Sequence, residues 1–275
     1  MIKLLAVDMD GTCLNSKGKM TDKTLEALKK AAESGVIVVP TTGRNITCLP
    51  KRLQSESFYR YVISSNGALV VDLKEDKEIF KSYIDPETAV EILDKCRKHL
   101  LLIAAHIDRD YYVQGPLLYI GVKKFLKEDA TVLKYVNSLA AAIKKNNYLV
   151  EEFQFFYHNG KYNNIIKEII KPYPNICSAH SEQYAEVFSS KGSKGTALLA
   201  LGEHLGIRPD EIACAGDEEN DLSMFSVAGH RFAMGNAIDA VKEKATVILP
   251  SNDEDGVAEA INRYILSDES RCKHD

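Results

Sequence analysis

The sequence predicts an α/β fold in which helices cover both faces of a mostly parallel sheet and an α+β module interrupts the chain. Short, continuously apolar runs alternate with amphipathic segments in the first quarter and again in the last third. Strands that are apolar throughout are typical of parallel sheets buried on both faces. Between these parts the aromatic residues concentrate, so residues 85–186 are expected to form a module inserted into a domain made of residues 1–84 and 187–275.

The first quarter is expected to alternate strand and helix. Residues 2–7 form an apolar run that predicts a buried strand. Leucines and alanines recur at helical spacing over residues 22–34, and Gly35 follows as a stop signal. Further strands are expected at residues 36–40, at residues 61–65 and, as a hairpin after the Asn66-Gly67 turn, through residues 69–80.

The middle module is expected to combine a hairpin with helices. Residues 101–107 and 110–114 predict the two strands of the hairpin, and helices are expected at residues 86–98 and about 128–145.

The last third returns to alternating helices and strands. Helices are expected at residues 195–206, 220–228, 237–245 and 255–266, with strands at residues 211–216, 231–235 and 246–249. The charged residues 268–275 are expected to fray.

Composition excludes several classes of function. The 275 residues carry a net charge of −4 without a long block of lysine or arginine, which disfavours nucleic-acid binding. No apolar run approaches the length of a membrane span, and Asp8 and Asp10 interrupt the first run before it reaches signal-peptide length. The six cysteines lack CxxC spacing, so reduced thiols and a cytoplasmic location are expected. A small molecule is the expected partner, and the oligomeric state stays open.

Two aspartates stand where the first strand ends. Asp8 and Asp10 follow its apolar run, at the sheet edge where open α/β sheets bind ligands. If the strand persists through Asp10, both side chains point the same way about 7 Å apart, and a cation between them would relieve their repulsion. The alternative is an ordinary Asp-Gly turn without a chemical role. Thr12, directly after this turn, is expected to stabilise it.

The second strand is followed by Thr41, Thr42, Gly43 and Arg44. Two hydroxyls and a glycine that lead toward a helix offer outward-pointing backbone N–H groups, which suit an anion. The alternative is an ordinary helix cap by Thr42.

A third strand end carries GDEEND, which contains Asp217, Asn220 and Asp221. Alone, such an acidic run is typical of a solvated helix N-terminus. Asp217 nevertheless follows a buried strand as Asp8 does, and Asp221 comes one helical turn later on the same face. The aspartates of the first strand and Asp217 are therefore expected to converge on one Mg²⁺ ion, a cation that needs only a few carboxylates.

A cation is also expected from the protein itself. Lys191 and Lys194 stand just before a helix, and a lysine is a compact charge that neutralises phosphate or carboxylate. This segment lacks the order of a Walker A loop, and the chain has no GxGxxG. An EF-hand is also excluded, because Asn262 stands where the bidentate glutamate would be.

Taken together, these motifs resemble those of the haloacid dehalogenase (HAD) superfamily. DMDGT resembles its first motif, the threonine of TTGR its second, Lys194 in SKGTAL its third and GDEEND its fourth. SSNGA, AMGNA and SNDEDGVA resemble the Cof-like branch (type IIB), which carries a C2-type cap between the second and third motifs. The resemblance covers nearly the whole chain. It implies a Rossmann-like core with residues 85–186 as the cap that determines substrate specificity.

The resemblance implies an Mg²⁺-dependent phosphatase of small phosphorylated metabolites, above all sugar phosphates. Asp8 would be the nucleophile that forms an aspartyl phosphate, and Asp10 the general acid and base, with its backbone carbonyl on the metal. Asp8 and Asp217 would give carboxylates to the metal, while Asp221 would either bind it, directly or through water, or orient Lys194. The residues implied for phosphate binding are Thr42, Gly43, Lys194 and Asn220, with Arg44 either contacting substrate or bridging surface carboxylates.

Two other functions stay open from the sequence. A phosphotransferase or phosphomutase would use the same aspartyl phosphate, whereas a sensor or scaffold would bind a phosphorylated ligand without turnover. The short motif loops offer no second phosphate site, which favours hydrolysis over transfer. A nucleophile together with a separate acid would be unnecessary for binding alone, which favours an enzyme.

Overall fold

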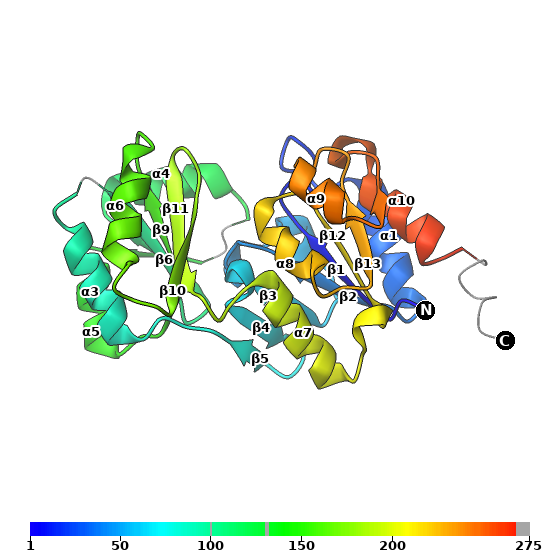
Figure 1. The fold of residues 1–275 in the computed structure, drawn as a ribbon, viewed down its shortest axis with the longest axis horizontal. Helices are drawn as coiled ribbons and strands as arrows, with labels where there is room; N and C mark the ends of the chain where they lie inside the picture. The colour runs from blue at the N-terminus through cyan, green and yellow to red at the C-terminus, as the bar shows by residue number, and fades with distance from the viewer. Residues whose placement is uncertain (100, 130–131, 268–275) are drawn as a thin grey trace. The chain divides into compact units, whose positions relative to one another are not determined.

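The computed structural model describes residues 1–99, 101–129 and 132–267, so the tail expected to fray lies outside the described residues. The chain separates into two compact units (Figure 1). The first, here called the core unit, comprises Met1–Gly43, Arg52–Lys81 and Ser193–Asp275; the second, the cap unit, comprises Arg44–Lys51 and Ser82–Gly192. Residues 44–51, placed with the first domain in the sequence analysis, thus group with the cap unit.

The core unit is built on one eight-stranded sheet. Its strands are β1 (Leu4–Asp8), β2 (Ile37–Thr41), β3 (Tyr61–Ser64), β4 (Leu69–Asp72), β5 (Lys77–Lys81), β12 (Ile212–Gly216), β13 (His230–Ala233) and β14 (Val247–Ile248). They lie in the order β14-β13-β12-β1-β2-β3-β4-β5. The pairs from β14 to β3 are parallel, while β4 and β5 add an antiparallel hairpin at one edge. The predicted α/β fold with a parallel sheet is confirmed.

Helices cover this sheet in two groups. The core unit contains α1 (Asp22–Glu33), α2 (Lys51–Gln54, whose first residue groups with the cap unit), α7 (Lys194–Leu205), α8 (Leu222–Phe225), α9 (Asp239–Lys244) and α10 (Gly256–Tyr264). Helix α1 packs against α10, while α7 packs against α8 and α8 against α9. The apolar stripe expected for α1 is present, since Leu25, Leu28 and Ala31 are all buried.

The sheet register brings three strand ends together. Every residue of β1 is buried, as expected for a strand covered on both faces. Asp8 at the end of β1 pairs with Thr41 at the end of β2. On the other side, Val7 pairs with Ala215 near the end of β12. In Figure 1 the blue strand β1 accordingly lies beside β12, although about two hundred residues separate them.

The cap unit has a six-stranded sheet of its own. Its strands are β6 (Leu102–Ile107), β7 (Asp110–Gln114), β8 (Leu133–Val136), β9 (Val150–Phe156), β10 (Ile176–His180) and β11 (Tyr184–Ser189), and its helices are α3 (Pro86–Cys96), α4 (Pro116–Leu126), α5 (Leu139–Asn146) and α6 (Lys161–Ile170). The strand order is β10-β11-β9-β6-β7-β8, antiparallel except for β7 and β8. The predicted α+β character and the hairpin of β6 and β7 are confirmed.

The helix expected at about residues 128–145 is present only in its second half and is wrong for residues 133–136; residues 130 and 131 lie outside the described residues. Strand β8 occupies part of this range, and helix α5 begins only at Leu139 because the Ser138 side chain caps it by accepting from the Ala141 backbone N–H. Helix α4, which was not expected, begins after Gly115, whose φ of 84° suits glycine, with Pro116 in its first turn.

Among the described residues, no helix is both long enough and apolar enough to cross a membrane.

Candidate active site

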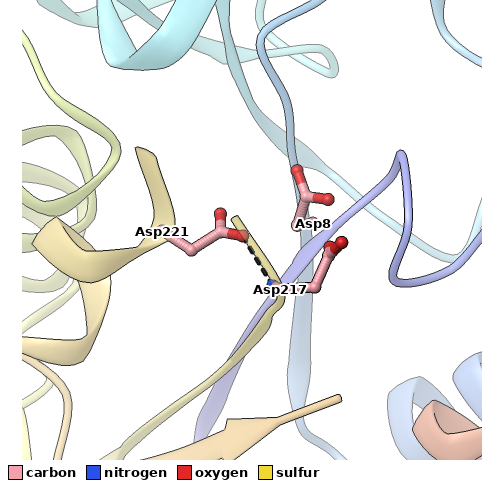
Figure 2. Close-up of side chains that lie close together, drawn as sticks. All are labelled: Asp8, Asp217 and Asp221. Atoms are coloured by element: carbon pink, nitrogen blue, oxygen red, sulfur yellow. Dashed lines mark hydrogen bonds between the residues drawn. The ribbon is translucent and has the colours of Figure 1, made fainter. Parts of the chain in front are cut away.

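Three buried carboxylates meet at the carboxyl edge of the core sheet. Asp8 ends β1, Asp217 follows β12, and Asp221 ends the short 3₁₀-helix η4 (Glu219–Asp221). One oxygen from each of the three lies within 4.8 Å of the others. Figure 2 shows the three side chains converging from these separate segments. We call this group the acidic triad.

Lys194 joins two members of the acidic triad. It is the first residue of α7, and the Ser193 side chain caps this helix by accepting from the Thr196 backbone N–H. The Lys194 side chain is 1% exposed, and its Nζ donates to Asp8 Oδ1 at 2.6 Å and to Asp221 Oδ1 at 2.7 Å. The sheet edge thus brings a buried cation into direct contact with the aspartate of the first strand.

Both oxygens of Asp221 are engaged by the protein. While Oδ1 accepts from Lys194, Oδ2 accepts from the backbone N–H groups of Asp217 at 2.8 Å and Glu218 at 3.1 Å; Figure 2 draws the first of these. A Cβ on Gly216 would lie 2.5 Å from Asp221 Cγ, so only glycine leaves room for this arrangement. Asp221 therefore holds both the lysine and the loop that carries Asp217.

Asp217 is held from the opposite side by the DMDGT loop. Its Oδ1 accepts from Thr12 Oγ1 at 2.7 Å, and its Oδ2 lies 3.4 Å from Asn236 Nδ2. Asn236 also donates to the Gly11 carbonyl at 2.9 Å. Thr12, expected only to stabilise its turn, thus also bonds the acidic triad.

Asp10 does not join the acidic triad. Strand β1 ends at Asp8 and the chain turns, so the alternation that would align Asp8 and Asp10 does not apply. Asp8 is 5% exposed, whereas Asp10 is exposed. The two aspartates therefore have different surroundings, one buried against Lys194 and one open to solvent.

A second group of polar residues gathers around Asn66. Asn220 Nδ2 donates to Asn66 Oδ1 at 2.9 Å, and the Asn66 backbone N–H donates to the Thr42 carbonyl at 3.1 Å. A Cβ on Gly43 would lie 2.9 Å from Asn66 Oδ1, so Gly43 and the amide are in close approach. Three residues expected to bind phosphate, Thr42, Gly43 and Asn220, are thus linked through Asn66. The helix-cap alternative for Thr42 is wrong, because Asn45 caps the 3₁₀-helix that follows.

Arg44 has its partners elsewhere. Its Nη1 donates to Asp129 Oδ2 at 2.8 Å and to the Cys48 carbonyl at 3.2 Å, all within the cap unit. Arg44 thus contacts a carboxylate, and its contact with substrate stays a prediction.

Burial raises the pKa of two members of the acidic triad, Asp8 and Asp217. Desolvation raises the pKa of Asp8 well above its ordinary value, although Lys194 opposes the shift. Desolvation likewise raises the pKa of Asp217 to about 7, against the hydrogen bond from Thr12. Burial alone would lower the pKa of Lys194, but the carboxylates of Asp221 and Asp8 outweigh it and raise that pKa. One lysine therefore does not neutralise three buried carboxylates.

These residues fit Mg²⁺. Carboxylate oxygens are the ligands that this cation prefers, and the excess negative charge of the triad is what a divalent cation would offset. Asp221 accepts three hydrogen bonds of 3.1 Å or less, whereas the contact of Asp217 Oδ2 with Asn236 is 3.4 Å long, so Asp8 and Asp217 are the better placed ligands.

Sequence reasoning assigned no role to Asn66 and Asn236, which hold the site together. Both stand in motifs, SSNGA and AMGNA, that pointed to the Cof-like branch. The chemical signal was weak, because an asparagine beside a glycine is also a common turn.

Comparison with known proteins places this geometry in a family. The model of the haloacid dehalogenase-like hydrolases matches residues 5–261. The 5-amino-6-(5-phospho-D-ribitylamino)uracil phosphatase YwtE of Bacillus subtilis is 30% identical, over 96% of this chain and 98% of its own length. A haloacid dehalogenase-like hydrolase from Bacteroides thetaiotaomicron superposes with a TM-score of 0.84 at 27% identity, covering 96% of this chain and 99% of that structure.

A third similarity concerns the branch within the family. The HAD subclass IIB sugar phosphatase BT4131 has a TM-score of 0.80 at 26% identity and covers 95% of this chain and 98% of its own. The chain therefore belongs to the haloacid dehalogenase-like hydrolases, as a phosphoric monoester hydrolase of their Cof-like phosphatase branch.

Proposed function

We propose that the protein is an Mg²⁺-dependent phosphatase that hydrolyses small phosphorylated metabolites through an aspartyl phosphate on Asp8. The observation that carries this proposal is the contact of the buried Lys194 ammonium with Asp8 Oδ1 at 2.6 Å, beside two further carboxylates. A carboxylate held at the end of a buried strand by a cation is oriented for attack, and the same cation attracts the phosphoryl group.

The reaction has two displacements at phosphorus. In the first, an Asp8 carboxylate oxygen forms the new bond to phosphorus while the bond to the leaving alkoxide breaks, and Asp10 gives that alkoxide a proton. In the second, Asp10 takes a proton from water, whose oxygen attacks phosphorus and releases phosphate from Asp8. The exposure of Asp10 supports this role, because the proton must pass between leaving group and solvent.

The negative charge on the phosphoryl oxygens must be stabilised by hydrogen-bond donors and positive charges during both displacements. Lys194 and the Asn220 amide are donors to these oxygens, with the Thr42 hydroxyl and the backbone at Gly43 on the other side. Mg²⁺, when bound, supplies a further positive charge at the same oxygens and keeps Asp8 ionised. Asp8, Asp217 and the Asp10 carbonyl would hold it, while Asp221 positions Lys194 and the Asp217 loop.

The substrate class follows from the relatives. One is named for a phosphorylated ribityl compound and another is a sugar phosphatase, so both names describe phosphate esters rich in hydroxyl groups. We therefore assign sugar phosphates and related polyol phosphates as substrates, with the cap unit as the part that selects among them.

The test is replacement of the nucleophile. Asp8→Asn keeps the shape of the side chain but removes its charge, and we expect phosphate release from p-nitrophenyl phosphate to fall by at least about a thousandfold. Asp94→Asn, an exposed aspartate of α3, is the control and should keep full activity. Circular dichroism checks that both variants fold.

Two outcomes would contradict the proposal. Unchanged turnover by the Asp8→Asn protein would show that the reaction does not pass through an aspartyl phosphate on Asp8. Release of p-nitrophenol by the wild-type protein that requires an added acceptor, with the phosphoryl group recovered on that acceptor, would instead identify a phosphotransferase, since a hydrolase needs only water and releases inorganic phosphate.

A further inference from the structure

The 3₁₀-turn η2 (Ser65–Gly67) follows β3 and has no role in the mechanism above. It nevertheless contacts the segment after β2. The Asn66 backbone N–H donates to the Thr42 carbonyl at 3.1 Å, and the Thr42 N–H donates in turn to the Ile63 carbonyl at 2.9 Å. The Asn66 amide also packs so closely on Gly43 that a Cβ there would lie 2.9 Å from Oδ1.

The same turn contacts the loop after β12. Asn66 Oδ1 accepts from Asn220 Nδ2 at 2.9 Å, across 154 residues of sequence. This bond fixes one hydrogen-bonding face of the Asn220 amide, and with it the direction in which the rest of that side chain points.

A third contact reaches the segment that delivers the lysine. A Cβ on Gly67 would lie 2.2 Å from the Ser193 carbonyl carbon and 2.5 Å from the Lys194 nitrogen, so the two backbones touch. Three segments that hold phosphoryl ligands, at Thr42-Gly43, at Lys194 and at Asn220, thus meet at one turn of three residues.

The backbone of this turn is held in an uncommon conformation. Asn66 has φ 54° and ψ 26°, in the left-handed region that only glycine adopts freely. Its side chain is nevertheless buried, at 5% exposure, and the residue is asparagine rather than glycine. A glycine would satisfy the backbone equally well, so the backbone conformation alone does not account for the asparagine, whereas its side-chain contacts do.

We propose that Asn66 is a positioning residue that aligns Asn220 and the Thr42-Gly43 segment with the phosphoryl group in the transition state. The inference rests on the proposed function, because it takes these groups as phosphoryl ligands. The hydrogen bonds of Asn66 described above go to Thr42 and Asn220, so its loss is expected to weaken the hold on the equatorial phosphoryl oxygens without removing the nucleophile.

The test compares Asn66→Gly with Asn147→Gly. Glycine keeps the left-handed backbone and deletes only the amide, and Asn147 has the same φ of 54° at the end of α5 in the cap unit. We expect Asn66→Gly to lower kcat for p-nitrophenyl phosphate by roughly 10- to 100-fold and to change KM less than about threefold. The Asn147→Gly protein should match the wild type.

Inhibition by orthovanadate separates positioning from a loss of structure. Vanadate adopts the five-coordinate geometry of the transition state, so its inhibition constant should rise in Asn66→Gly by about the factor that kcat falls. If the amide served only stability, part of the enzyme would be inactive and kcat would fall, but the inhibition constant of the remaining enzyme would stay unchanged. That result would overturn the inference.

A double-mutant cycle shows whether Asn66 acts through Asn220. We expect the combined fold-loss of Asn66→Gly with Asn220→Ala to be clearly smaller than the product of the two single fold-losses, because part of the effect of Asn66 passes through Asn220. Independent effects, whose fold-losses multiply, would overturn the inference. Failure of the proposed function looks different: it would appear in the wild-type and Asp8→Asn proteins before any change at Asn66.

Discussion

At the scale of single residues, Lys194 is a buried cation that separates two buried carboxylates of like charge. Its ammonium lies between Asp8 and Asp221, at 2.6 and 2.7 Å, in a place from which solvent is excluded. Removing the Lys194 ammonium would leave two buried carboxylates without a cation between them. The loss of one partner from a buried ion pair lowers the free energy of unfolding by about 3–5 kcal/mol. Asp217 belongs to the same group of carboxylates but accepts a hydrogen bond from Thr12. Burial raises the pKa of Asp217 to about 7.

We therefore expect Mg²⁺ to stabilise the folded protein as well as activate it. Binding to the native state alone would raise the melting temperature by roughly 3–10 °C at saturating metal. Asp217→Asn should lose most of that rise because it removes one carboxylate ligand, and EDTA should silence the wild-type enzyme until Mg²⁺ is restored. Calorimetry with and without metal measures the first effect. A melting temperature and an activity both indifferent to Mg²⁺ and EDTA would contradict the assignment of the acidic triad.

At the scale of elements, a salt bridge fastens the antiparallel edge of the core sheet. Arg60, just before β3, donates from Nε to Asp72 Oδ1 at 2.9 Å and from Nη2 to Oδ2 at 2.6 Å, at the end of β4. These hydrogen bonds lower the pKa of Asp72 to about 2 from its ordinary 3.8. These bonds join β3 and β4, which form a hairpin closed by the Ser65–Gly67 turn. The register of this hairpin therefore helps to determine where Asn66 lies in the candidate site.

The stability contributed by Asp72 should depend on pH. Its pKa is lower in the folded chain than in the unfolded one, so the contribution is complete above about pH 4 and is lost as the pH falls toward 2. Asp72→Asn should reduce the free energy of unfolding by about 1–3 kcal/mol at pH 7, and by less at pH 3. Urea titrations at both pH values measure this, with Asp76→Asn in the exposed turn between β4 and β5 as control. A deficit of equal size at both pH values would exclude ionisation as its cause.

The elements differ in how well the sequence predicted them. Strands of the core sheet are continuous apolar runs such as that of β1, and the polar residues at their ends follow directly, so both fold and candidate residues could be found. In the cap unit, half of the residues of strand β8 are exposed, and the sequence predicts a helix there. The role of Asn66 could not be predicted for a different reason. Its partner Asn220 is 154 residues away in the sequence, and no local sequence pattern indicates such a contact.

At the scale of the whole molecule, two separate cores stabilise two units. The core of the cap unit includes Phe153 and Phe155 on β9, both completely buried. In the core unit, Phe232 on β13 is 1% exposed and stacks on Tyr264 of α10. Each unit therefore has an apolar core of its own, and we expect each to be able to unfold while the other stays folded.

Hydrogen exchange should reveal that separation. Phe153→Ala removes a fully buried ring and should destabilise the cap unit by about 3–5 kcal/mol. Amides of β6, β9 and β11 should then exchange faster, while those of β1 and β12 keep their protection. Phe232→Ala should give the reverse pattern, and mass spectrometry of peptides reads both. Equal loss of protection in both units would show that they unfold as one.

The placement of β1 between β12 and β2 has a consequence for biosynthesis. During translation the strand at the centre of the core sheet is made before the cap unit, yet one of its neighbours, residues 212–216, follows the entire cap unit. Until then one apolar edge of the nascent sheet stays open to wrong pairing, while the cap unit already has all of its strands. A chaperone that binds growing chains would find its target in the segment that carries β1 rather than in the module completed first.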